Sequence, residues 1–333
     1  MKFHFEFAIK KLQHPITHHH SMMMVGSCFT ENMGNLLRAS KFRVMDNPNG
    51  ILFNPISVSE AIHQYINNKN FSKDDLFCLN ESWHSWKHHS KFSGITAEEA
   101  VEKINQSTFE ANELLQNADY LFITLGSAWI YELAKDAPEA ANVGVAANNH
   151  KAPANWFSKR LLSTNETISS LEKMLAALRI FNPHLTIIFT ISPVRHLREG
   201  VIENNQSKAV LIQAVHEIVK QSEQHYYFPS YELMIDDLRD YRFYAEDLIH
   251  PNYHATQYIW EKFVESCIAD NTQLLLKSIQ EINIAYQHKP FNPSTIAHQS
   301  FLHKYATIVK MLQEKYPELD LQKELNYFSS GTK

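Results

Sequence analysis

Residues 21–37, SMMMVGSCFTENMGNLL, join a short apolar run to a helical pattern across one glycine. The uncharged run before Gly26 is typical of a buried strand in a parallel sheet. After the glycine, apolar residues recur at the spacing of one helix face, beginning with Phe29. The segment therefore predicts a strand that ends at Gly26, a sharp turn through Ser27 and Cys28, and a helix.

Two further apolar runs end in the same manner, at 120–126 (YLFITLG) and at 185–192 (LTIIFTIS). Helical patterns alternate with these runs, over residues 97–115, 163–180 and 207–224. Strands that alternate with helices are typical of βαβ units and a mainly parallel sheet. The sequence therefore predicts an α/β fold, arranged as a three-layer α/β/α sandwich.

Other segments are interpreted from their local composition. Residues 57–67 predict a helix in which Ser57 and Glu60 form a capping box. Four more predictions are a half-buried strand at 1–7, a turn at 47–50 (NPNG), a long surface loop at 135–154 and a strand-like stretch at 225–236. We expect one α/β domain over residues 1–270 and, after a helical pattern at 254–279, a helical C-terminal extension over 271–333.

The composition excludes several classes of protein. The chain has 333 residues, with 31 Lys and Arg against 36 Asp and Glu, and this acidic balance disfavours nucleic acid as a partner. No window approaches the ~18–20 uncharged apolar residues of a membrane span, so no membrane partner is expected. The cysteines Cys28, Cys78 and Cys267 form no CxxC pattern, and the N-terminal region lacks the apolar segment of a signal peptide. We therefore expect a cytoplasmic protein.

A second motif lies late in the α/β region, at 247–252 (DLIHPN). An Asp three residues before a His can reach the imidazole, fix its tautomer and stabilise the imidazolium. A nucleophile on the first turn would lie at the carboxyl edge of the sheet, with helix amides close to a developing anion. We therefore predict one catalytic site that combines Asp247 and His250 with the turn residues Ser27 and Cys28. We expect neither a metal nor another cofactor.

These motifs resemble those of the GSCFA family, which belongs to the SGNH/GDSL-like hydrolase superfamily. The family's name-giving motif, GSCF, stands at 26–29 after the first predicted strand. Other similar stretches are NPNGILFNP at 47–55, ITLGSAW at 123–129, ISPVRH at 191–196 and YFPSYELMIDDLRDYRFYAEDLIHPN at 227–252. The resemblance spans roughly residues 20–265, and it implies a three-layer α/β/α fold with esterase-like acyl chemistry.

The resemblance also implies roles for individual residues. The superfamily's first block is Gly-Asp-Ser, and its Ser is the nucleophile. When Gly26 is laid on that Gly, Cys28 stands at the nucleophile's position, so either Cys28 attacks or Ser27 does after a one-residue shift. A thiolate needs less help from a base than a hydroxyl does, which favours Cys28. His250 would be the general base and then the general acid, and Asp247 would orient it.

The oxyanion hole is a further implication of the resemblance. In the superfamily it uses the nucleophile's own N–H, a Gly after the second strand and an Asn in the third block. Gly50 is the counterpart of that Gly, whereas Ala128 stands where the Asn is expected. The Ser127 hydroxyl or the Trp129 indole N–H could substitute, since the loss of one such donor typically costs ~3–4 kcal/mol of transition-state stabilisation.

Two further side chains are candidates for substrate binding. His84 lies in an aromatic and histidine-rich stretch at 83–89 (WHSWKHH), which could line an acyl or sugar pocket or serve packing alone. Arg195 follows the third predicted strand and could bind an anionic substrate group or form a structural ion pair.

Three functions fit these residues. The first is an SGNH-type ester hydrolase that removes a small acyl group from a carbohydrate or a similar polar scaffold through an acyl-enzyme. The second is an acyltransferase that passes the acyl group from the same intermediate to another acceptor. The third is a non-catalytic binding protein, because Ala128 replaces the expected Asn. The C-terminal helices are expected to pack on the α/β body or to join two copies in a homo-oligomer.

Overall fold

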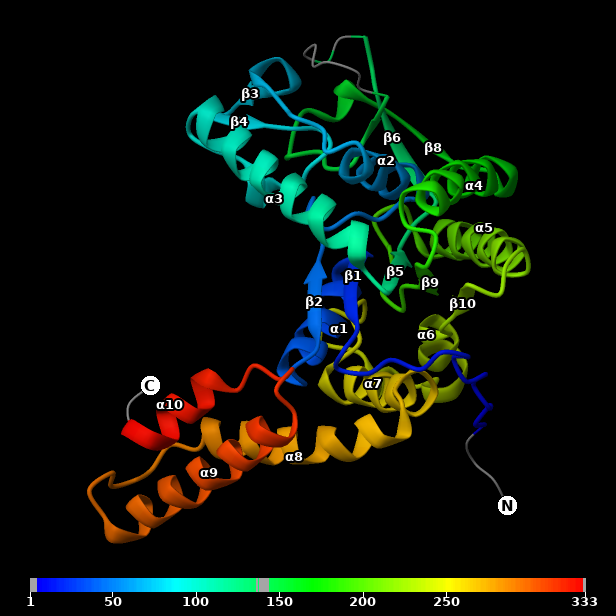
Figure 1. Ribbon diagram of the computed structural model, residues 1–333. Coiled ribbons are helices and arrows are strands. Elements are labelled where there is room, and N and C mark those ends of the chain that lie inside the picture. Colours follow the sequence, from blue (N-terminus) through cyan, green and yellow to red (C-terminus); the bar gives the residue numbers. More distant parts are fainter. Residues whose placement is uncertain (1–4, 136, 138–143, 332–333) are drawn as a thin grey trace. The chain divides into compact units, whose positions relative to one another are not determined.

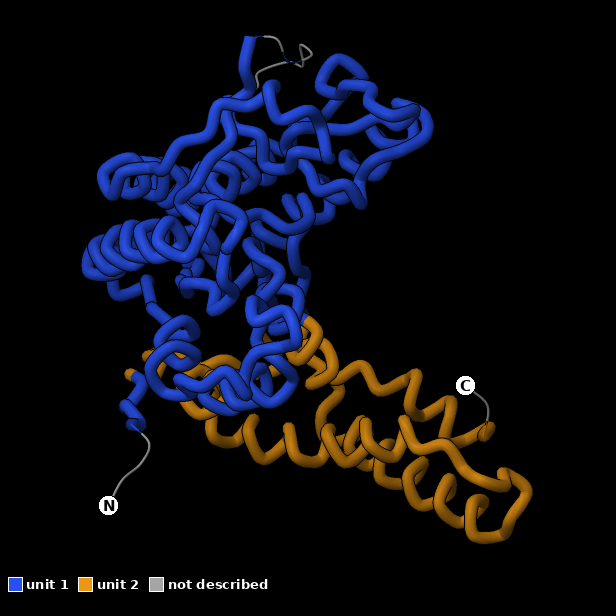
Figure 2. The backbone as a smooth tube through the Cα atoms, turned by 180° about the vertical axis from the view of Figure 1, so that it is seen from behind, with its two compact units in different colours: residues 1–9, 21–34, 44–262 blue, residues 10–20, 35–43, 263–333 orange. Residues whose placement is uncertain are grey.

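The computed structural model describes residues 5–135, 137 and 144–331 (Figure 1). The backbone forms two compact units, which Figure 2 shows in different colours. One unit comprises Met1–Ile9, Ser21–Gly34 and Val44–Lys262, and the other comprises Lys10–His20, Asn35–Arg43 and Phe263–Lys333. Every candidate site residue named above belongs to the first unit. The domain boundary after residue 270 stays a prediction.

A five-stranded sheet forms the centre of the first unit, in the order β10-β9-β5-β1-β2. Its strands are β1 (Ser21–Gly26), β2 (Arg43–Asp46), β5 (Tyr120–Leu125), β9 (Thr186–Ile191) and β10 (His225–Tyr227). The pairs β1–β5, β5–β9 and β9–β10 are parallel, with Val25 opposite Ile123 and Ile123 opposite Phe189. The predicted α/β fold class with a mainly parallel sheet is confirmed.

Four helices share a core with this sheet and pack against one another (Figure 1): α2 (Pro55–Ile66), α3 (Ala97–Asn117), α4 (Thr164–Phe181) and α5 (Val201–Val219). Alternate strand residues, such as Val25, Ile123 and Phe189, contribute to this core. The residues between them, such as Met24 and Phe122, are also buried. Both faces of the sheet are therefore covered, which explains why its strands are uninterrupted apolar runs in the sequence.

The strand order creates a topological switch point between β1 and β5. The chain passes from β1 to β2 on one side of the sheet, whereas β5, β9 and β10 follow one another on the other side. In open α/β sheets ligands bind at the carboxyl ends of the strands beside such a point. The residues that follow β1 and β5 are Ser27 with Cys28, and Gly126 with Ser127.

Smaller elements surround the main sheet. β3 (Phe77–Leu79) and β4 (Ser82–His84) form a hairpin, and β6 (Trp129–Leu133) pairs antiparallel with β7 (Val145–Ala146) and β8 (Phe157–Leu161). α6 (Ser230–Glu232) continues into a π-helix at Leu233–Leu238. Short 3-10 helices lie at Lys73–Asp75, Ser90–Phe92, Ala154–Trp156 and Tyr241–Phe243. α1 (Cys28–Ala39) and α7 (Tyr253–Cys267) each begin in the first unit and end in the second.

The C-terminal part of the second unit is helical, as the sequence predicts. Its helices are α8 (Asp270–Gln287), α9 (Ile296–Lys315) and α10 (Gln322–Ser330). They share a core that includes Ile279, Val309 and Phe328. Lys41 and Glu324 form an ion pair at 2.7 Å within this unit, with little of either side chain exposed.

Two predicted helix starts are wrong for local reasons. α2 begins at Pro55, and its cap is Asn54, whose Oδ1 accepts the N–H of Ser57 at 2.8 Å. Proline suits the first helical position because its missing N–H would have no partner there. Ser57 therefore lies inside the helix rather than at its cap, and the expected capping box does not form. α5 begins at 201 rather than 207, directly after Gly200.

Other predicted segments also differ. The expected loop at 135–154 contains the short strand β7. The expected strand-like stretch at 225–236 forms a strand over three residues only, β10. The expected helix at 254–279 is divided into two helices, α7 and α8. The described part of the expected strand at 1–7, residues 5–7, forms no strand, and residues 1–4 lie outside the described residues. Phe5 is 70% exposed, so the alternation of Phe residues does not mark a buried face.

None of the helices in the described parts of the chain combines the length and apolar character needed to cross a membrane.

Candidate active site

Gly26 ends β1 in a backbone conformation that suits only glycine. Its φ is +148°, and a Cβ atom there would lie 2.1 Å from the carbonyl oxygen of Thr124 on β5. The Asn47 side chain fixes the strand end, because its Oδ1 accepts the Gly26 N–H at 2.8 Å. The chain therefore turns sharply into α1 at the carboxyl edge of the sheet.

Ser27 and Cys28 follow this turn with different exposures. Ser27 is 1% exposed, and its Oγ accepts the N–H of Phe29 at 3.3 Å, so the hydroxyl caps the start of α1. Cys28 is the first residue of α1, is partly exposed and carries a free thiol. Cys28 is therefore the more accessible of the two candidate nucleophiles.

Opposing influences act on the Cys28 thiol. Burial raises its pKa, whereas the backbone N–H groups of Phe29 and of Cys28 itself lower it. Among nearby charges, Glu31 raises this pKa and Lys208 lowers it, and the net effect is a pKa above the usual value. The thiolate therefore depends on its N–H and cationic neighbours for stabilisation.

The carboxyl end of β5 lies beside the same turn. A Cβ atom on Gly126 would lie 3.4 Å from the Cβ of Ser27. The N–H groups of Gly126 and Ser127 both donate to the carbonyl oxygen of Phe53, at 2.8 and 3.0 Å. The turns that follow β1 and β5 therefore lie side by side at the switch point. The N–H groups of Gly126 and Ser127 already have a hydrogen-bond partner.

The expected oxyanion donors are engaged within the protein. Gly50 has a φ of +78° and donates its N–H to the carbonyl oxygen of Asn47 at 2.7 Å, in a tight turn. Trp129 donates its indole N–H to the carbonyl oxygen of Glu203 at 3.3 Å. The Ser127 hydroxyl is buried, accepts the N–H of Trp129 at 3.1 Å and lies 3.3 Å from the Ser207 hydroxyl.

Asp247 and His250 are hydrogen bonded to each other on an exposed loop. Nδ1 of His250 donates to Asp247 Oδ2 at 2.7 Å, while Oδ1 accepts the N–H groups of Ile249 at 2.9 Å and of His250 at 3.0 Å. The side-chain bond from His250, followed by the two backbone bonds, lowers the pKa of Asp247 to about 2. Because Nδ1 carries the donated proton, Nε2 keeps a lone pair that can accept another.

Arg195 holds this loop. Its guanidinium lies 4.1 Å from the ring centroid of Tyr244 and donates from Nη1 to the carbonyl oxygen of Leu248 at 3.3 Å. Its N–H donates to the carbonyl oxygen of Ile249 at 3.2 Å. Arg195 forms no ion pair with a carboxylate in the described parts of the chain. These contacts position the loop that carries His250 against the segment that follows β9.

The two halves of the predicted catalytic site do not touch directly. Among the residues that the structure describes, no hydrogen bond joins His250 to Ser27 or Cys28. His196 and Lys208 are near these halves, because the charges of Lys208 and His250 both lower the pKa of His196, and the charge of Cys28 raises that of Lys208. Catalytic hydrogen bonds are often long in unliganded sites and tighten when substrate binds.

The GSCFA family matches residues 21–263, which run from β1 into α7. The chain belongs to the GSCFA family. A second match, to the C-terminal domain of GSCFA domain proteins, covers residues 279–333. None of the curated proteins matches this GSCFA chain. A crystal structure of a carbohydrate esterase family 3 from Talaromyces cellulolyticus shares 10% sequence identity with it, at a TM-score of 0.33, over 79% of this chain and 99% of that one.

Two residues near the candidate site were given no site role from the sequence, namely the half-buried His196 and the buried Lys208. Burial and the charge of Lys208 lower the pKa of His196 to about 4, so its ring is neutral at pH 7. Lys208 is 1% exposed and shares the buried face of α5 with Leu211 and Val215. Leu211 and Val215 follow Lys208 at helical spacing, which indicates a shared helix face. Because the helix was expected to begin at 207, Lys208 was placed in its first turn, at an exposed end.

A pocket of about 330 Å³ opens beside His196. We call it the Trp129 pocket; its lining includes Phe53, Ser127, Trp129, His150, His196 and Arg198. The lining combines rings with polar groups, as is typical of sites for small molecules. Two residues of this lining, Ser127 and Trp129, were predicted as site residues.

His84 does not line this pocket; it lies on β4 of the β3–β4 hairpin, with its ring centroid 4.7 Å from that of His150, which does line it. Its Nδ1 is 2.6 Å from Ser93 Oγ, and its Nε2 is 3.2 Å from the carbonyl oxygen of Leu79. Both ring nitrogens therefore have partners within the hairpin and the segment that follows it.

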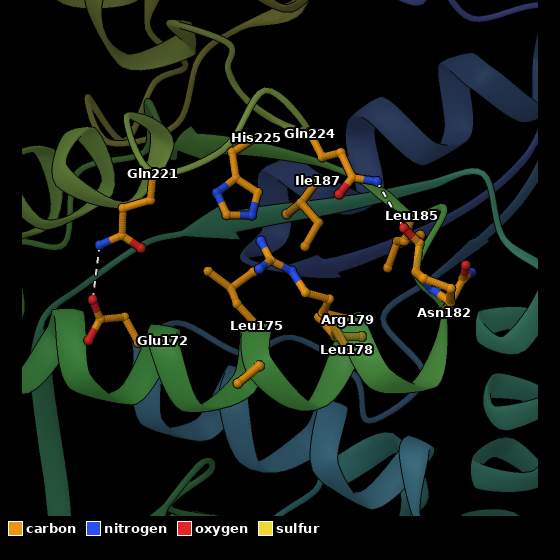
Figure 3. Close-up of a pocket in the computed structure, with 12 residues that line it drawn as sticks. Glu172, Leu175, Leu178, Arg179, Asn182, Leu185, Ile187, Gln221, Gln224 and His225 are labelled. Carbon is orange, nitrogen blue, oxygen red and sulfur yellow. Dashed lines mark hydrogen bonds between the residues drawn. The ribbon is translucent and has the colours of Figure 1, made fainter.

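A second pocket, of about 340 Å³, lies at the amino ends of β9 and β10 (Figure 3). We call it the amino-end pocket; its lining includes Glu172, Arg179, Asn182, Gln221, Gln224 and His225. Gln221 donates to Glu172 Oε1 at 2.9 Å, and Gln224 donates to the carbonyl oxygen of Pro183 at 2.9 Å. This pocket is therefore at the edge of the sheet opposite the GSCF turn.

Proposed function

We propose that this protein is an ester hydrolase of the SGNH type, which forms an acyl-enzyme on Cys28 and releases the acid with the help of His250 and Asp247. The observation that carries the proposal is the presence, at the carboxyl edge, of a partly exposed thiol on the glycine turn and of an aspartate–histidine hydrogen bond on the loop that Arg195 holds. These are the groups that nucleophilic acyl chemistry uses.

The reaction takes place in two steps. In the first, Cys28 Sγ bonds to the ester carbonyl carbon, the bond to the alkoxide breaks, and the thiol proton passes through His250 Nε2 to the alkoxide. In the second, His250 takes a proton from water, the hydroxide attacks the thioester, and the proton returns to the sulfur. Asp247 keeps Nδ1 of His250 protonated, so that Nε2 is the acceptor in both steps.

Two features favour Cys28 over Ser27 as the nucleophile. Ser27 is 1% exposed and its hydroxyl already caps α1, whereas Cys28 is partly exposed. The N–H of Cys28 is the first amide of α1, where no helical partner exists; it stabilises the thiolate of the same residue, and in the proposed reaction it would be offered to the developing oxyanion once the sulfur has attacked. The helix N-terminus also favours negative charge at this position.

The Trp129 pocket supports a substrate with a small acyl group on a carbohydrate or a similar polar scaffold. Trp129 and Phe53 contribute rings, and Asn148, Asn149 and Arg198 contribute polar groups, to the lining of the same pocket. Aromatic faces with a few polar groups suit the mixed surface of a sugar ring.

Acylation by an activated acetate ester tests the proposal. After p-nitrophenyl acetate is added, the intact mass of the wild type and of Ser27→Ala should rise by one acetyl group, and the mass of Cys28→Ala should not. The adduct should be released by neutral hydroxylamine, since it is a thioester. Labelling that survives in Cys28→Ala and is lost in Ser27→Ala would assign the attack to Ser27, and labelling lost in neither would refute the proposal.

A binding protein on the same fold is the second candidate, because one observation favours it. The N–H groups of Gly50, Gly126, Ser127 and Trp129 all donate within the protein, so the oxyanion would rest mainly on Cys28 N–H. If carbohydrate esters bind in calorimetry but no ester is turned over, the binding function is correct. Acyl transfer is distinguished by adding acceptor alcohols or amines and measuring the acylated acceptor.

A further inference from the structure

Arg198 is an unpaired cation on the lining of the Trp129 pocket. The residue is exposed, and its guanidinium lies over the ring of Tyr131, which also lines the pocket, 5.2 Å from the ring centroid. In the described parts of the chain, the Arg198 side chain forms neither an ion pair nor a hydrogen bond. A guanidinium has five N–H donors in a planar fork, so these donors stay available to a ligand.

The carboxylate next to Arg198 in the sequence, Glu199, is already engaged. Its Oε1 accepts the Tyr131 hydroxyl at 2.5 Å and pairs with Lys159 Nζ at 3.2 Å. Only 5% of the Glu199 side chain is exposed. Lys159 also lies over the Trp129 ring, 4.9 Å from its centroid. Glu199 therefore serves to hold the aromatic wall of the pocket in place, and its negative charge is offset by Lys159.

The charges around the pocket leave an excess of positive charge. The described lining carries two cations, Arg198 and Lys151, and one carboxylate, that of Glu199. Lys159 is not part of this lining, but it neutralises Glu199 from behind the wall. Neither Arg198 nor Lys151 has a carboxylate partner among the described residues. A negatively charged ligand would therefore find two cations whose charge is not offset by the protein.

The two histidines of the lining, His150 and His196, are neutral at pH 7. Burial is the largest influence on both rings, and it lowers the pKa of each to about 4. Both ring nitrogens of His150 have hydrogen-bond partners within the protein. The His196 ring packs edge-on against Phe53, with 4.4 Å between the centroids, and forms no hydrogen bond to a described residue. Charge recognition in this pocket therefore belongs to Arg198 and Lys151, and His196 can bond to an uncharged hydroxyl group.

Phe53 connects the pocket to the glycine turn. Phe53 and Ser127 both line the pocket, and the Phe53 carbonyl oxygen accepts the N–H groups of Gly126 and Ser127. A Cβ atom on Gly126 would lie 3.1 Å from Cδ1 of Phe53 and 3.4 Å from the Cβ of Ser27. A ligand in the Trp129 pocket would therefore lie beside the turn that leads into Cys28.

We propose that the Trp129 pocket takes a substrate with an anionic group, either a carboxylate or a phosphate, and that the guanidinium of Arg198 binds this group. The planar fork of an arginine matches both groups with paired hydrogen bonds, whereas Lys151 would contribute charge from the opposite part of the lining. The inference rests on the proposed function in that it takes the polar scaffold of the ester to be a sugar. It narrows that scaffold to an acidic sugar.

The test is calorimetric titration of the full chain with three hexoses that differ only at carbon 6, namely glucose, glucuronate and glucose 6-phosphate. At pH 7 and low salt, at least one acidic sugar should bind about tenfold more tightly than glucose, because hydrogen bonds between charged groups are the stronger ones. Added salt should reduce this preference, since Arg198 is exposed to solvent. The tighter of the two acidic sugars identifies the anionic group as a carboxylate or a phosphate.

Three variants assign the preference to a residue. Arg198→Met should lower the affinity for the acidic sugars to that for glucose and leave the affinity for glucose unchanged. Arg198→Lys keeps the charge without the planar fork, so it should retain part of the preference. Arg179→Met is the matched control, because Arg179 lines the amino-end pocket and also has no carboxylate partner in the described parts of the chain. It should retain the full preference.

Equal affinity for all three sugars overturns the inference, and so does a preference that survives in Arg198→Met. A preference lost in Arg179→Met alone would assign the anion to the amino-end pocket and overturn it as well. Because calorimetry needs no turnover, the result is independent of the acylation test. A preference without any acyl-enzyme would uphold the inference and refute the hydrolase. An acyl-enzyme without a preference would do the reverse.

Discussion

At the amino ends of β9 and β10, Gln221 and Gln224 use their side-chain amides in hydrogen bonds within the protein, whereas at the carboxyl end of β1 the partly exposed Cys28 carries a free thiol. Gln221 bonds to Glu172, and Gln224 bonds to a carbonyl oxygen. At the opposite edge, Cys28 is a free thiol, and Lys208 is buried with no carboxylate partner among the described residues. We therefore expect the amino edge to contribute to stability and the carboxyl edge, with its free thiol, to contribute to chemistry.

The two edges of the sheet each have a pocket, and the two pockets are of nearly equal size. The amino-end pocket measures about 340 Å³ and the Trp129 pocket about 330 Å³, so volume does not distinguish them. The difference lies in their neighbours, because only the Trp129 pocket adjoins residues that follow the strands at the switch point. Cavity size alone therefore does not identify either pocket as the functional site.

Removal of the imidazole at the carboxyl edge should have the largest effect. His250→Ala should lower the turnover of p-nitrophenyl acetate by about 10²–10⁴-fold, because general acid–base catalysis is lost. Asp247→Asn should lower it less, since a thiol–histidine pair can persist without its orienting carboxylate. His225→Ala, in the amino-end pocket, is the matched control and should retain turnover. Equal losses in His250→Ala and His225→Ala would contradict the division between the two edges.

The glycine turn should be the next most sensitive feature, in stability rather than turnover. Gly26→Ala should reduce the free energy of unfolding by about 3 kcal/mol, because a Cβ atom would collide with the Thr124 carbonyl group and φ is positive. Urea unfolding measures the change. Gly144→Ala is the control, since nothing lies within 4 Å of a Cβ atom there. A Gly26 variant as stable as the Gly144 variant would mean that the turn is not strained as described.

Lys208 should give the protein a pH-dependent stability. An unfolded lysine has a pKa of about 10.4, and the folded value for Lys208 is lowered to about 7. Between these values the unfolded chain binds more protons, so the free energy of unfolding should rise with pH, by up to about 1.4 kcal/mol per unit. Denaturant unfolding at pH 7, 8 and 9 should show this rise in the wild type and in Lys87→Met, which removes a lysine that pairs with Glu60 at 2.8 Å. A rise that persists in Lys208→Met would assign it to another group.

The amino-end pocket should give the smallest effect. Gln221→Ala removes one partly exposed hydrogen bond to Glu172 and should cost about 0.5 kcal/mol in the free energy of unfolding. Intact-mass acylation of Cys28 should be unchanged. A loss of acylation in this variant would show that the two edges are coupled.

The sequence predicts the central sheet because its signals are local. An apolar run closed by a glycine marks β1 and β5 without knowledge of their partners. The hairpin strands β3 and β4 and the strands β6 and β8 were missed, because they are short and only partly buried, so neither a continuous apolar run nor a clean alternation marks them. Their existence depends on pairing partners that the sequence does not reveal.

The candidate site was predictable where the motif was contiguous and not where it depended on tertiary packing. Asp247 and His250 are three residues apart, so their contact follows from spacing. Lys208 was overlooked because its Nζ donates to the carbonyl oxygens of Gly126 and Ser192, which are distant in the sequence. The partners of Gly50 and Trp129 are likewise set by the turns around them, which a motif comparison cannot supply.

The strand order has a consequence for how the protein emerges from the ribosome. β1, β5, β9 and β10 are neighbours in the same sequence in which they are synthesised, so each new strand can add to the free edge left by the one before. The turn that carries Cys28 is made with the first strand, whereas the loop that carries His250 comes after the last. A nascent chain therefore contains its thiol well before the histidine is translated, and a growing chain halted before β10 is finished would hold the proposed nucleophile without the proposed base.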